Sequence, residues 1–322
     1  MSAVLGRTRS VGLGKETTYG VAVAPTVWLP QEDVSIEDKI ARIYDNSGLG
    51  TRNGSFGGDT SMTSASGNIN GLVYDRSFGH IATAARGVVT TAAHSTAVGV
   101  NVHTISAGNT LPSYTIATKD DNESKRSSGA MLDKLTIKAN QGYVTFTSSW
   151  MAIKGATAAN TPSFTAENRF RPQDVVIKIA PTVAGLAGAT ALRVKDLTFS
   201  LDNSLITEPS LGTTDPAYYP GTIKTSLSMG RLYLDTTIKD LVFGTTQQAL
   251  SIAFTRSDTL IGTGSPTNPS IVLTFQPGFF SEWSRDGGLD ALKQEKFSYT
   301  PIFSTTTASE FGLVMTNTEA GY

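Results

Sequence analysis

The chain has 322 residues, a length that suits two domains of ordinary size. It carries 26 Lys and Arg against 27 Asp and Glu, so it lacks the basic excess with which proteins hold nucleic acid by its phosphates. Cysteine is absent, which excludes a disulfide framework and a thiolate metal site. Charged residues make up only 16% and Gly numbers 31, a composition that favours an all-β protein with modest cores and long turns.

Residues 1–30 are predicted to form an N-terminal arm. Glycines punctuate this segment and prolines close it, at Gly6, Gly12, Gly14, Gly20, Pro25 and Pro30. Its valines and Trp28 are apolar enough to dock, so we expect the arm to order on a neighbour or on its own domain. The start lacks the apolar region of a signal peptide, and no run of about 18 apolar residues occurs. We therefore expect synthesis and folding in the cytoplasm.

One stretch, Glu32–Arg86, is echoed by a second, Arg193–Gly244. Each is predicted to fold as strand, loop, strand and short helix. The first copy reads Val34–Asp45, Asn46–Gly58, Thr60–Tyr74 and Asp75–Arg86, and the second reads Val194–Asp202, Asn203–Gly221, Thr222–Leu234 and Asp235–Phe243. The tripeptide Asp45-Asn46-Ser47 recurs as Asp202-Asn203-Ser204. Two copies of one unit indicate a protein built to assemble.

The strands and helices of the two copies have recognisable signals. Leu197, Phe199 and Leu201 alternate with polar residues, whereas the first copy slips in phase and predicts a bulge near Asp38–Lys39. Asp75 and Asp235 are each placed to cap the helix that follows. The strand Thr60–Tyr74 is so polar that it suits a wet surface better than a core.

Both predicted loops exceed the usual hairpin length of about 2–5 residues, which indicates a reaching contact. The candidate assembly residues in these loops are Gly48, Gly50, Arg52, Gly54, Pro209 and Pro216. The expected domain layout is an arm at 1–30, copy 1 at 31–155, a linker at 156–162 and copy 2 at 163–322. A hairpin is predicted between Leu135 and Trp150, and a short helical turn at Leu289–Leu292.

Catalytic and cofactor chemistry finds no support in the motifs. His80, His94 and His103 form neither a paired ligand motif nor a cluster. Gly12-Leu13-Gly14-Lys15 lacks the glycine and hydroxyl positions of a phosphate loop. Neighbouring carboxylates such as Glu37 and Asp38 are typical of a solvated strand face. We therefore expect no enzyme, with no catalytic residue, cofactor or metal.

The segment Leu13–Thr26 resembles the opening of tail-tube proteins, also called major tail proteins, of long-tailed, non-contractile bacteriophages. The likeness is spread over most of the chain and continues at Asp33–Ile36, Gly48–Arg52, Gly67–Ile69, Asp133–Ala139, Phe170, Val194–Asn203 and Leu232–Thr245. The resemblance implies a mainly β fold: tandem β-sandwich or split-barrel domains, each with a short flanking helix. It also implies rings of sixfold character whose hairpins join into a continuous inner β-barrel.

The resemblance further implies stacked rings whose lumen conducts viral DNA during ejection, without specific binding. A tape-measure protein would fill the lumen first, and tail terminator and distal tail proteins would cap the tube in the virion. The inner-barrel strands would include Val34, Ile36, Asn68, Asn70, Thr222, Lys224, Ser226 and Ser228. Near-neutral charge suits DNA transit, since phosphate binding would stall it.

Because one chain holds two copies, three chains would complete a ring with pseudo-sixfold symmetry. A hexamer with a decoration domain at 163–322 is the alternative. Two other classes stay open: another virion or surface structural protein, such as a distal-tail ring, a capsid decoration protein or a pilus-like shaft, and a carbohydrate-active β-sandwich enzyme. The enzyme class lacks aromatic platforms and a carboxylate pair at a defined site.

Overall fold

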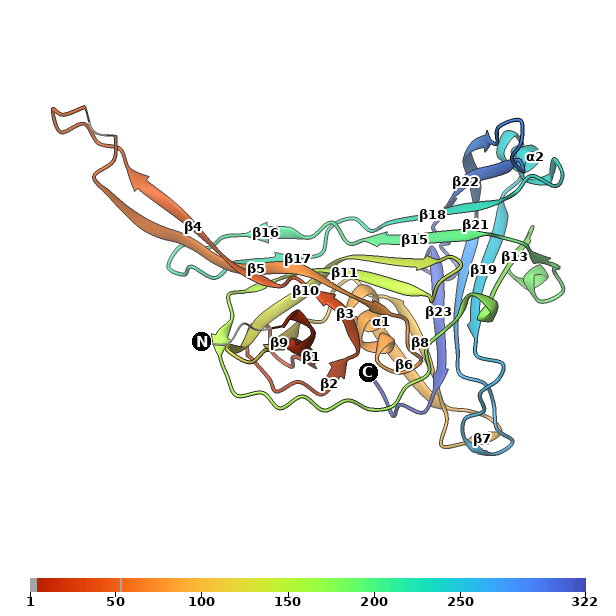
Figure 1. Cartoon of the computed structure of the whole chain (residues 1–322), viewed down its shortest axis with the longest axis horizontal. Coiled ribbons are helices and arrows are strands. Elements are labelled where there is room, and N and C mark those ends of the chain that lie inside the picture. Colours follow the sequence, from red (N-terminus) through yellow and green to blue (C-terminus); the bar gives the residue numbers. More distant parts are fainter. Residues whose placement is uncertain (1–4, 53) are drawn as a thin grey trace.

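The computed structural model describes residues 5–52 and 54–322 of a mainly β chain (Figure 1). The strands before residue 160 are β1 (Ser10–Lys15), β2 (Val27–Leu29), β3 (Gln31–Val34), β4 (Glu37–Asp45), β5 (Gly57–Leu72), β6 (Gly87–Ala93), β7 (Ala97–Val98), β8 (Asn101–Ala107), β9 (Tyr114–Lys119), β10 (Ser124–Ala139), β11 (Thr145–Ile153) and β12 (Ala156–Thr157). The first α-helix, α1 (Phe78–Arg86), follows β5, and a short 3-10 helix spans Gly6–Thr8.

The later strands are β13 (Val175–Ala180), β14 (Ala191–Leu192), β15 (Asp196–Asp202), β16 (Ile206–Glu208), β17 (Ala217–Tyr219), β18 (Lys224–Leu232), β19 (Gln248–Thr255), β20 (Thr263–Gly264), β21 (Ser270–Asp286), β22 (Gln294–Pro301) and β23 (Phe311–Asn317). The second α-helix, α2 (Thr237–Phe243), follows β18. Two further 3-10 helices span Pro172–Asp174 and Ala184–Ala187.

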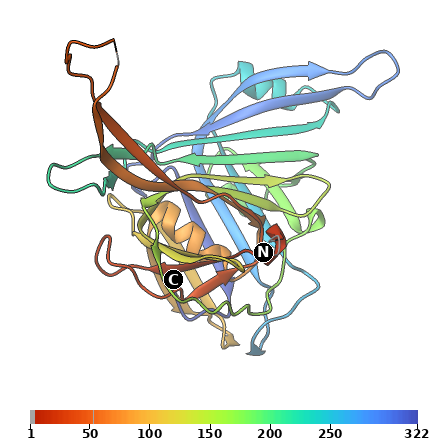
Figure 2. The same ribbon diagram turned by 60° about the vertical axis from the view of Figure 1, so that its left-hand side comes forward.

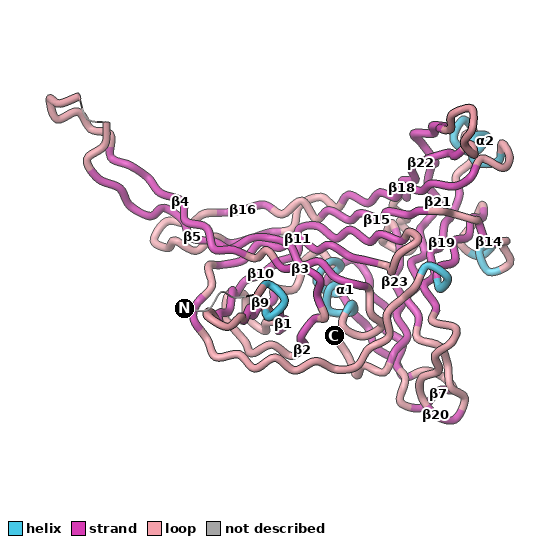
Figure 3. Tube along the Cα trace, viewed as in Figure 1, coloured by secondary structure: helices cyan, strands magenta, loops and turns pink. Residues whose placement is uncertain are grey.

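One long antiparallel sheet runs through both halves of the chain (Figure 3). Its strand order is β4–β5–β11–β10–β15–β18–β22–β21, with β3 continuing the edge of β4. The first halves of β10 and β21 bend away into two outer sheets, β2–β1–β9–β10–β12 and β14–β13–β19–β21–β23–β8–β6. These pairings close no ring among the described residues, so the single chain is an open structure with free sheet edges.

The two halves of the chain share one order of strand pairing. The path β1–β9–β10–β11–β5–β4 in the first half matches β13–β19–β21–β22–β18–β15 in the second. Trp150 of β11 and Tyr299 of β22 are fully buried aromatic residues at matching positions. Trp150 pairs with Leu132 of β10, and Tyr299 pairs with Phe280 of β21. Helices α1 and α2 follow the matching strands β5 and β18.

The repeated tripeptide marks a shared turn but a different strand position. Asp45 and Asp202 each accept the backbone N–H of the serine two residues on, at 2.9 and 2.7 Å. Ile69 of β5 and Met229 of β18 occupy matching positions, and they pair with Val34 and Leu197, respectively. Counting five residues on from each partner, Asp202 corresponds in register to Lys39 rather than to Asp45. The β4–β5 hairpin therefore runs six residues further before its turn, and it projects far from the body (Figure 2).

Several local predictions need correction. The strand expected at Val34–Asp45 is divided into β3 and β4. The register shifts opposite Ala41 and Arg42 rather than near Asp38–Lys39, and the extra residue there is Ser61 of β5. The residues predicted to turn helically at Leu289–Leu292 form only a turn.

Asp75 is not the helix cap that the sequence predicts. Helix α1 begins at Phe78 after Ser77. The carboxylate of Asp75 instead accepts the backbone and side-chain N–H groups of Asn168, at 2.9 and 2.8 Å, and so fastens that segment to the start of the helix. The carboxylate of Asp235 does accept the backbone N–H of Thr237 at 2.9 Å, beside the start of α2.

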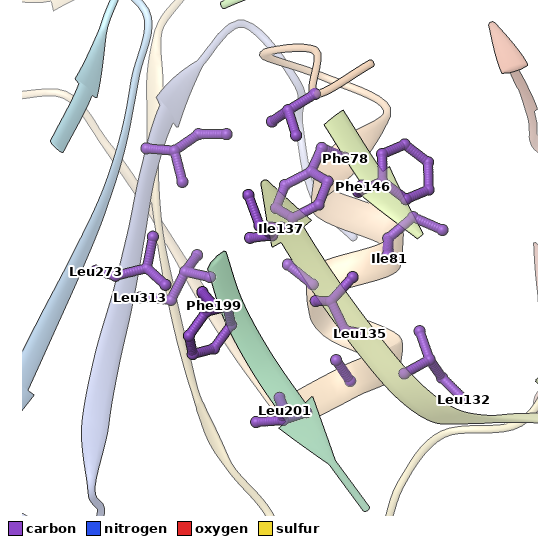
Figure 4. Close-up of a cluster of buried hydrophobic side chains, with 14 of the residues drawn as sticks. Phe78, Ile81, Leu132, Leu135, Ile137, Phe146, Phe199, Leu201, Leu273 and Leu313 are labelled. Atoms are coloured by element: carbon purple, nitrogen blue, oxygen red, sulfur yellow. The ribbon is translucent and has the colours of Figure 1, made fainter. Parts of the chain in front are cut away.

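A single hydrophobic cluster joins the two halves of the chain. Figure 4 shows Phe78 and Ile81 of α1 beside Leu135 and Ile137 of β10, with Phe199 and Leu201 of β15, Leu273 of β21 and Leu313 of β23 completing the group. All of these side chains are buried to a few per cent exposure or less. Each fully buried Leu, Ile or Phe contributes about 1.5–3 kcal/mol, so the shared cluster ties the halves together strongly.

From Ser10 onward, the predicted arm packs on the chain's own sheet. Strand β1 pairs with β9 and β2, and its Val11 and Leu13 are fully buried. Just beyond it, the buried carboxylate of Glu16 accepts four hydrogen bonds, listed by donor as Ser113 Oγ (2.7 Å), Thr115 Oγ1 (2.8 Å), Gly129 N (2.9 Å) and Gly20 N (3.0 Å). Four donors satisfy a charge that burial would otherwise make costly. Residues 1–4 of the arm lie outside the described part.

Candidate assembly surfaces

The long sheet has one apolar and one polar face. Alternate residues point to opposite faces, so buried Phe199 and Leu227 lie on one side and Ser200 and Ser226 on the other. Small polar residues continue in register from the first half to the second in a row made of Asn70, Thr147, Thr136, Ser200 and Ser226. The polar face is therefore one surface built by both halves.

The predicted inner-barrel residues divide between the two faces. Asn68, Asn70, Lys224, Ser226 and Ser228 follow the polar alternation, and Asn68 and the β18 residues are exposed. Val34 and Ile36 are buried, at 6% and 1% exposure, so their side chains belong to the core side. Thr222 is exposed but precedes β18.

The two halves join where β10 pairs with β15. The register places Thr136 opposite Ser200 and Ile137 opposite Phe199. An ion pair crosses this junction on the polar face, because Lys134 Nζ lies 2.9 Å from Asp202 Oδ2. Its hydrogen bond to Asp202 raises the pKa of the Lys134 ammonium group. The junction therefore joins the two halves by both backbone pairing and a side-chain ion pair.

Two edges of the long sheet stay open. Strand β4 pairs only with β5, and the last part of β21, from Ser281 to Asp286, pairs only with β22 among the described strands. The corresponding strands of the other half, β15 and β10, have neighbours on both edges. Open strand edges expose unpaired N–H and C=O groups that can pair with another chain.

The two helices differ in how far they are buried. Helix α1 is buried at nearly every residue, whereas α2 buries only Ile238 and leaves Phe243 at 71% exposure. Beside α2 runs a groove lined largely by apolar side chains, including Ile179, Leu192 and Leu241. The second half thus exposes a helix face whose counterpart in the first half is covered.

Residues from the far end of the chain cover α1. The ring of Tyr322 stands edge-on to His80 at 5.0 Å, and its hydroxyl donates to the carbonyl of Arg76 at 2.8 Å. A Cβ on Gly79 would lie 2.0 Å from this ring, so the close contact requires glycine. Burial lowers the pKa of His80 to about 4, so this histidine is neutral at pH 7 and serves packing.

The two long loops behave differently. The first carries Gly48, Gly50, Arg52 and Gly54 as exposed residues at the tip of the projecting β4–β5 hairpin. The second contains the paired strands β16 and β17, as the sequence did not predict, and folds back onto the first half. There Thr63 donates its N–H to Thr214 at 2.8 Å. The described part of the first loop thus projects from the body, whereas the second loop is anchored to it on one side.

Tyr218 holds the folded-back loop in place. Its hydroxyl donates to the carbonyl of Ala152 at 3.1 Å, and its ring is buried beside Met131 and Leu111. Of the two loop prolines, Pro216 is buried and its carbonyl accepts the hydroxyl of Tyr19 at 3.4 Å, whereas Pro209 is exposed.

Binding chemistry is sparse on these surfaces. Within residues 5–52 and 54–322, no three His, Asp or Glu side chains gather as metal ligands. The same described residues contain no helix of the length and apolarity needed to cross a bilayer. His103 is buried between the hydroxyl of Thr91 at 2.9 Å and the amide oxygen of Asn317 at 3.0 Å. The notable surfaces are thus edges and faces suited to other protein strands.

A family model described as phage tail tube protein matches residues 6–278. This chain belongs to that family. Comparison with curated proteins gave no match. The tail tube protein is therefore a structural subunit of a phage tail, from a family that is in general not enzymatic, and its place is the tail of the virion.

Sequence reasoning missed several long-range contacts of this tail tube protein. The β10–β15 junction joins residues about 60 apart in sequence, and only the matching polar alternation of Lys134–Lys138 and Thr198–Asp202 hinted at it. The covering roles of Tyr218 and Tyr322 left no local signal, because both depend on distant partners.

Proposed function

We propose that three copies of this chain form a pseudo-sixfold ring of a non-contractile phage tail tube. Each chain contributes two tandem tail-tube domains, copy 1 at 31–155 and copy 2 at 163–322, separated by the linker at 156–162. The long sheets of neighbouring chains join edge to edge into a continuous inner barrel. Rings stack into a tube, and viral DNA passes through its lumen during ejection.

The observation that carries this proposal is the β10–β15 junction. Within one chain, the last strand of the first four-stranded unit pairs with the first strand of the second unit. The same contact, repeated between chains, would pair the end of β21 with β4 of the next chain. That repetition removes both open edges, which is the advantage of closing a sheet into a barrel.

The register of the contact between chains follows from the internal one. Strands β10 and β11 of the first half correspond to β21 and β22 of the second. Thr136 pairs with Thr147 in the first pair of strands and Ser284 with Lys296 in the second, so Ser284 is the counterpart of Thr136. Ser200 lies three residues after Leu197, as Glu37 lies three residues after Val34. Since Thr136 faces Ser200, we expect Ser284 to face Glu37 of the next subunit.

Exposed apolar groups of the second half support the same contact. Met131 is covered by Tyr218, whereas Phe279, at the matching position of β21, is 40% exposed. Ile302 and Phe303 lie exposed beyond the paired strand β22, at 40% and 57%. The β4–β5 hairpin of the next subunit carries exposed Ile40, Ile43 and Tyr44, which suit this surface. Burying these side chains would help to drive ring closure.

The polar sheet face would line the lumen. Its side chains are mainly Ser, Thr and Asn, and Lys134 is paired with Asp202. The lysines of this wet face alternate with carboxylates, as Asp202 lies between Lys134 and Lys224. Little net positive charge would then hold the phosphates of passing double-stranded DNA. The other proposed partners are a tape-measure protein in the lumen, with tail terminator and distal tail proteins at the ends. Synthesis in the host cytoplasm would precede assembly.

Electron cryomicroscopy of purified tubes tests the proposal. We expect rings of three chains whose map is sharp under threefold averaging, with α1 and α2 resolved as different helices at alternating positions. Sixfold averaging should blur the two loops, since one is folded back and the other projects. Rings of six chains with residues 163–322 outside the barrel would contradict the trimer and favour a decoration domain.

A further inference from the structure

Arg9 makes an unusual contact with the open edge of the long sheet. Its guanidinium donates from Nη1 to the carbonyl of Val34 and from Nη2 to the carbonyl of Ile36, both at 2.9 Å. The carbonyl of Arg9 in turn accepts the side-chain amide of Gln31 at 2.8 Å, which fixes the backbone that carries it. One planar side chain thus bridges two carbonyls that lie two residues apart.

These two carbonyls are acceptors at the start of the open edge, which continues along β4 to Asp45. Ser35 donates its backbone N–H to the carbonyl of Asn68 in β5 at 2.9 Å, so the backbone hydrogen-bonding groups of Ser35 point toward β5. In an antiparallel ladder, neighbouring residues direct their N–H and C=O groups to opposite sides. Val34 and Ile36 therefore direct theirs away from β5, toward the side where a further strand would add.

The second half shows what occupies the same place when a strand is present. Val34 and Ile36 correspond to Leu197 and Phe199 of β15. Those residues pair with Ala139 and Ile137 of β10. The guanidinium of Arg9 therefore stands where the backbone N–H groups of an incoming strand would lie.

We propose that Arg9 guards the β3–β4 edge of the unassembled subunit and is displaced by β21 of the next subunit. This inference rests on the proposed ring. A guanidinium suits the task because its rigid fork of donors satisfies two acceptors at once. An edge whose first two acceptors are already bonded is a poorer template for premature or mismatched pairing. Displacement restores the same number of bonds to these carbonyls, so the guard delays closure without opposing it permanently.

The test compares Arg9→Gln with the matched control Arg7→Gln, which changes an exposed arginine two residues away. Each full-length variant is mixed, below its assembly concentration, with a labelled peptide of residues 276–288, and binding is followed by fluorescence anisotropy. We expect Arg9→Gln to bind the peptide about tenfold more tightly than wild type and Arg7→Gln to match wild type, a tenfold change being about 1.4 kcal/mol. A scrambled peptide reports non-specific binding, and circular dichroism confirms folding.

Light scattering during assembly supplies the second measurement. We expect Arg9→Gln to begin polymerising earlier than wild type and to form tubes of the same diameter. Unchanged or weaker peptide binding, or unchanged or later polymerisation, would overturn the guard, because Arg9 would then merely brace the subunit. If wild type formed no rings at all, the proposed ring would fail, and peptide binding alone would then decide whether Arg9 guards the edge.

Discussion

Replacing Arg285 of β21 by proline should abolish ring and tube formation while leaving the isolated subunit folded. Ile137, the counterpart of Arg285, faces β15 across the junction, opposite Phe199. The backbone N–H of Arg285 therefore points to the open edge rather than toward β22. Proline removes that donor and is tolerated at an edge strand. Leaving the facing carbonyl without its donor costs about 1–3 kcal/mol per contact, which weakens each contact by about one to two orders of magnitude.

The matched control is Arg285→Ala, which keeps the N–H group and removes the same side chain. We expect this variant to form tubes, so that the difference between the two isolates the backbone contact. Size-exclusion chromatography and negative-stain electron microscopy report assembly, and circular dichroism reports folding. Normal tubes from Arg285→Pro would mean that the end of β21 is not a subunit edge.

The largest loss of stability is expected from Arg231→Met. Arg231 is 5% exposed, and its Nε donates to Glu295 Oε1 at 2.5 Å. Glu295 is fully buried, and within the described part of the chain its carboxylate otherwise accepts just the indole N–H of Trp283, at 2.7 Å. Removing the arginine leaves a buried carboxylate without its cation, which typically costs about 3–5 kcal/mol. Urea denaturation followed by tryptophan fluorescence measures this change.

Lys134→Met is the matched control for that experiment. Lys134 also pairs across neighbouring strands, with Asp202, but its side chain is 58% exposed. Exposed ion pairs contribute about 0–1 kcal/mol, so the unfolding free energy should fall by less than about 1 kcal/mol. Equal losses from Arg231→Met and Lys134→Met would show that burial of the Glu295 carboxylate does not govern this site.

Much of the strand content could be predicted from local alternation. Leu197, Phe199 and Leu201 alternate with polar residues in β15, and the polar run of β5 does reach an exposed face. Period-two patterns report which side of a strand is buried, and they do so wherever one face is wet. The family resemblance carried the functional class, and residues 6–278 match the tail tube family.

The remaining features depend on distances that a local pattern does not contain. The Asp-Asn-Ser tripeptide fixed a turn in both halves, yet the ladder register differs because the first hairpin is longer. The contact of Arg9 with Val34 and Ile36 spans about 25 residues, and that of Tyr322 with Arg76 joins opposite ends of the sequence. Such contacts follow from how sheets stack, not from propensity.

A designed disulfide across the proposed subunit edge tests the central claim most directly. The chain has no cysteine, so Glu37→Cys with Ser284→Cys introduces the only thiols. The corresponding Thr136–Ser200 pair is a non-hydrogen-bonded one, whose Cα atoms lie about 4.5 Å apart, within the usual disulfide range of about 4.4–6.8 Å. After oxidation of assembled tubes, a non-reducing gel should show linked products that end at three chains. Products extending to six chains would contradict the trimeric ring. Linkage only by the shifted pair Glu37→Cys with Asp286→Cys would contradict the proposed register.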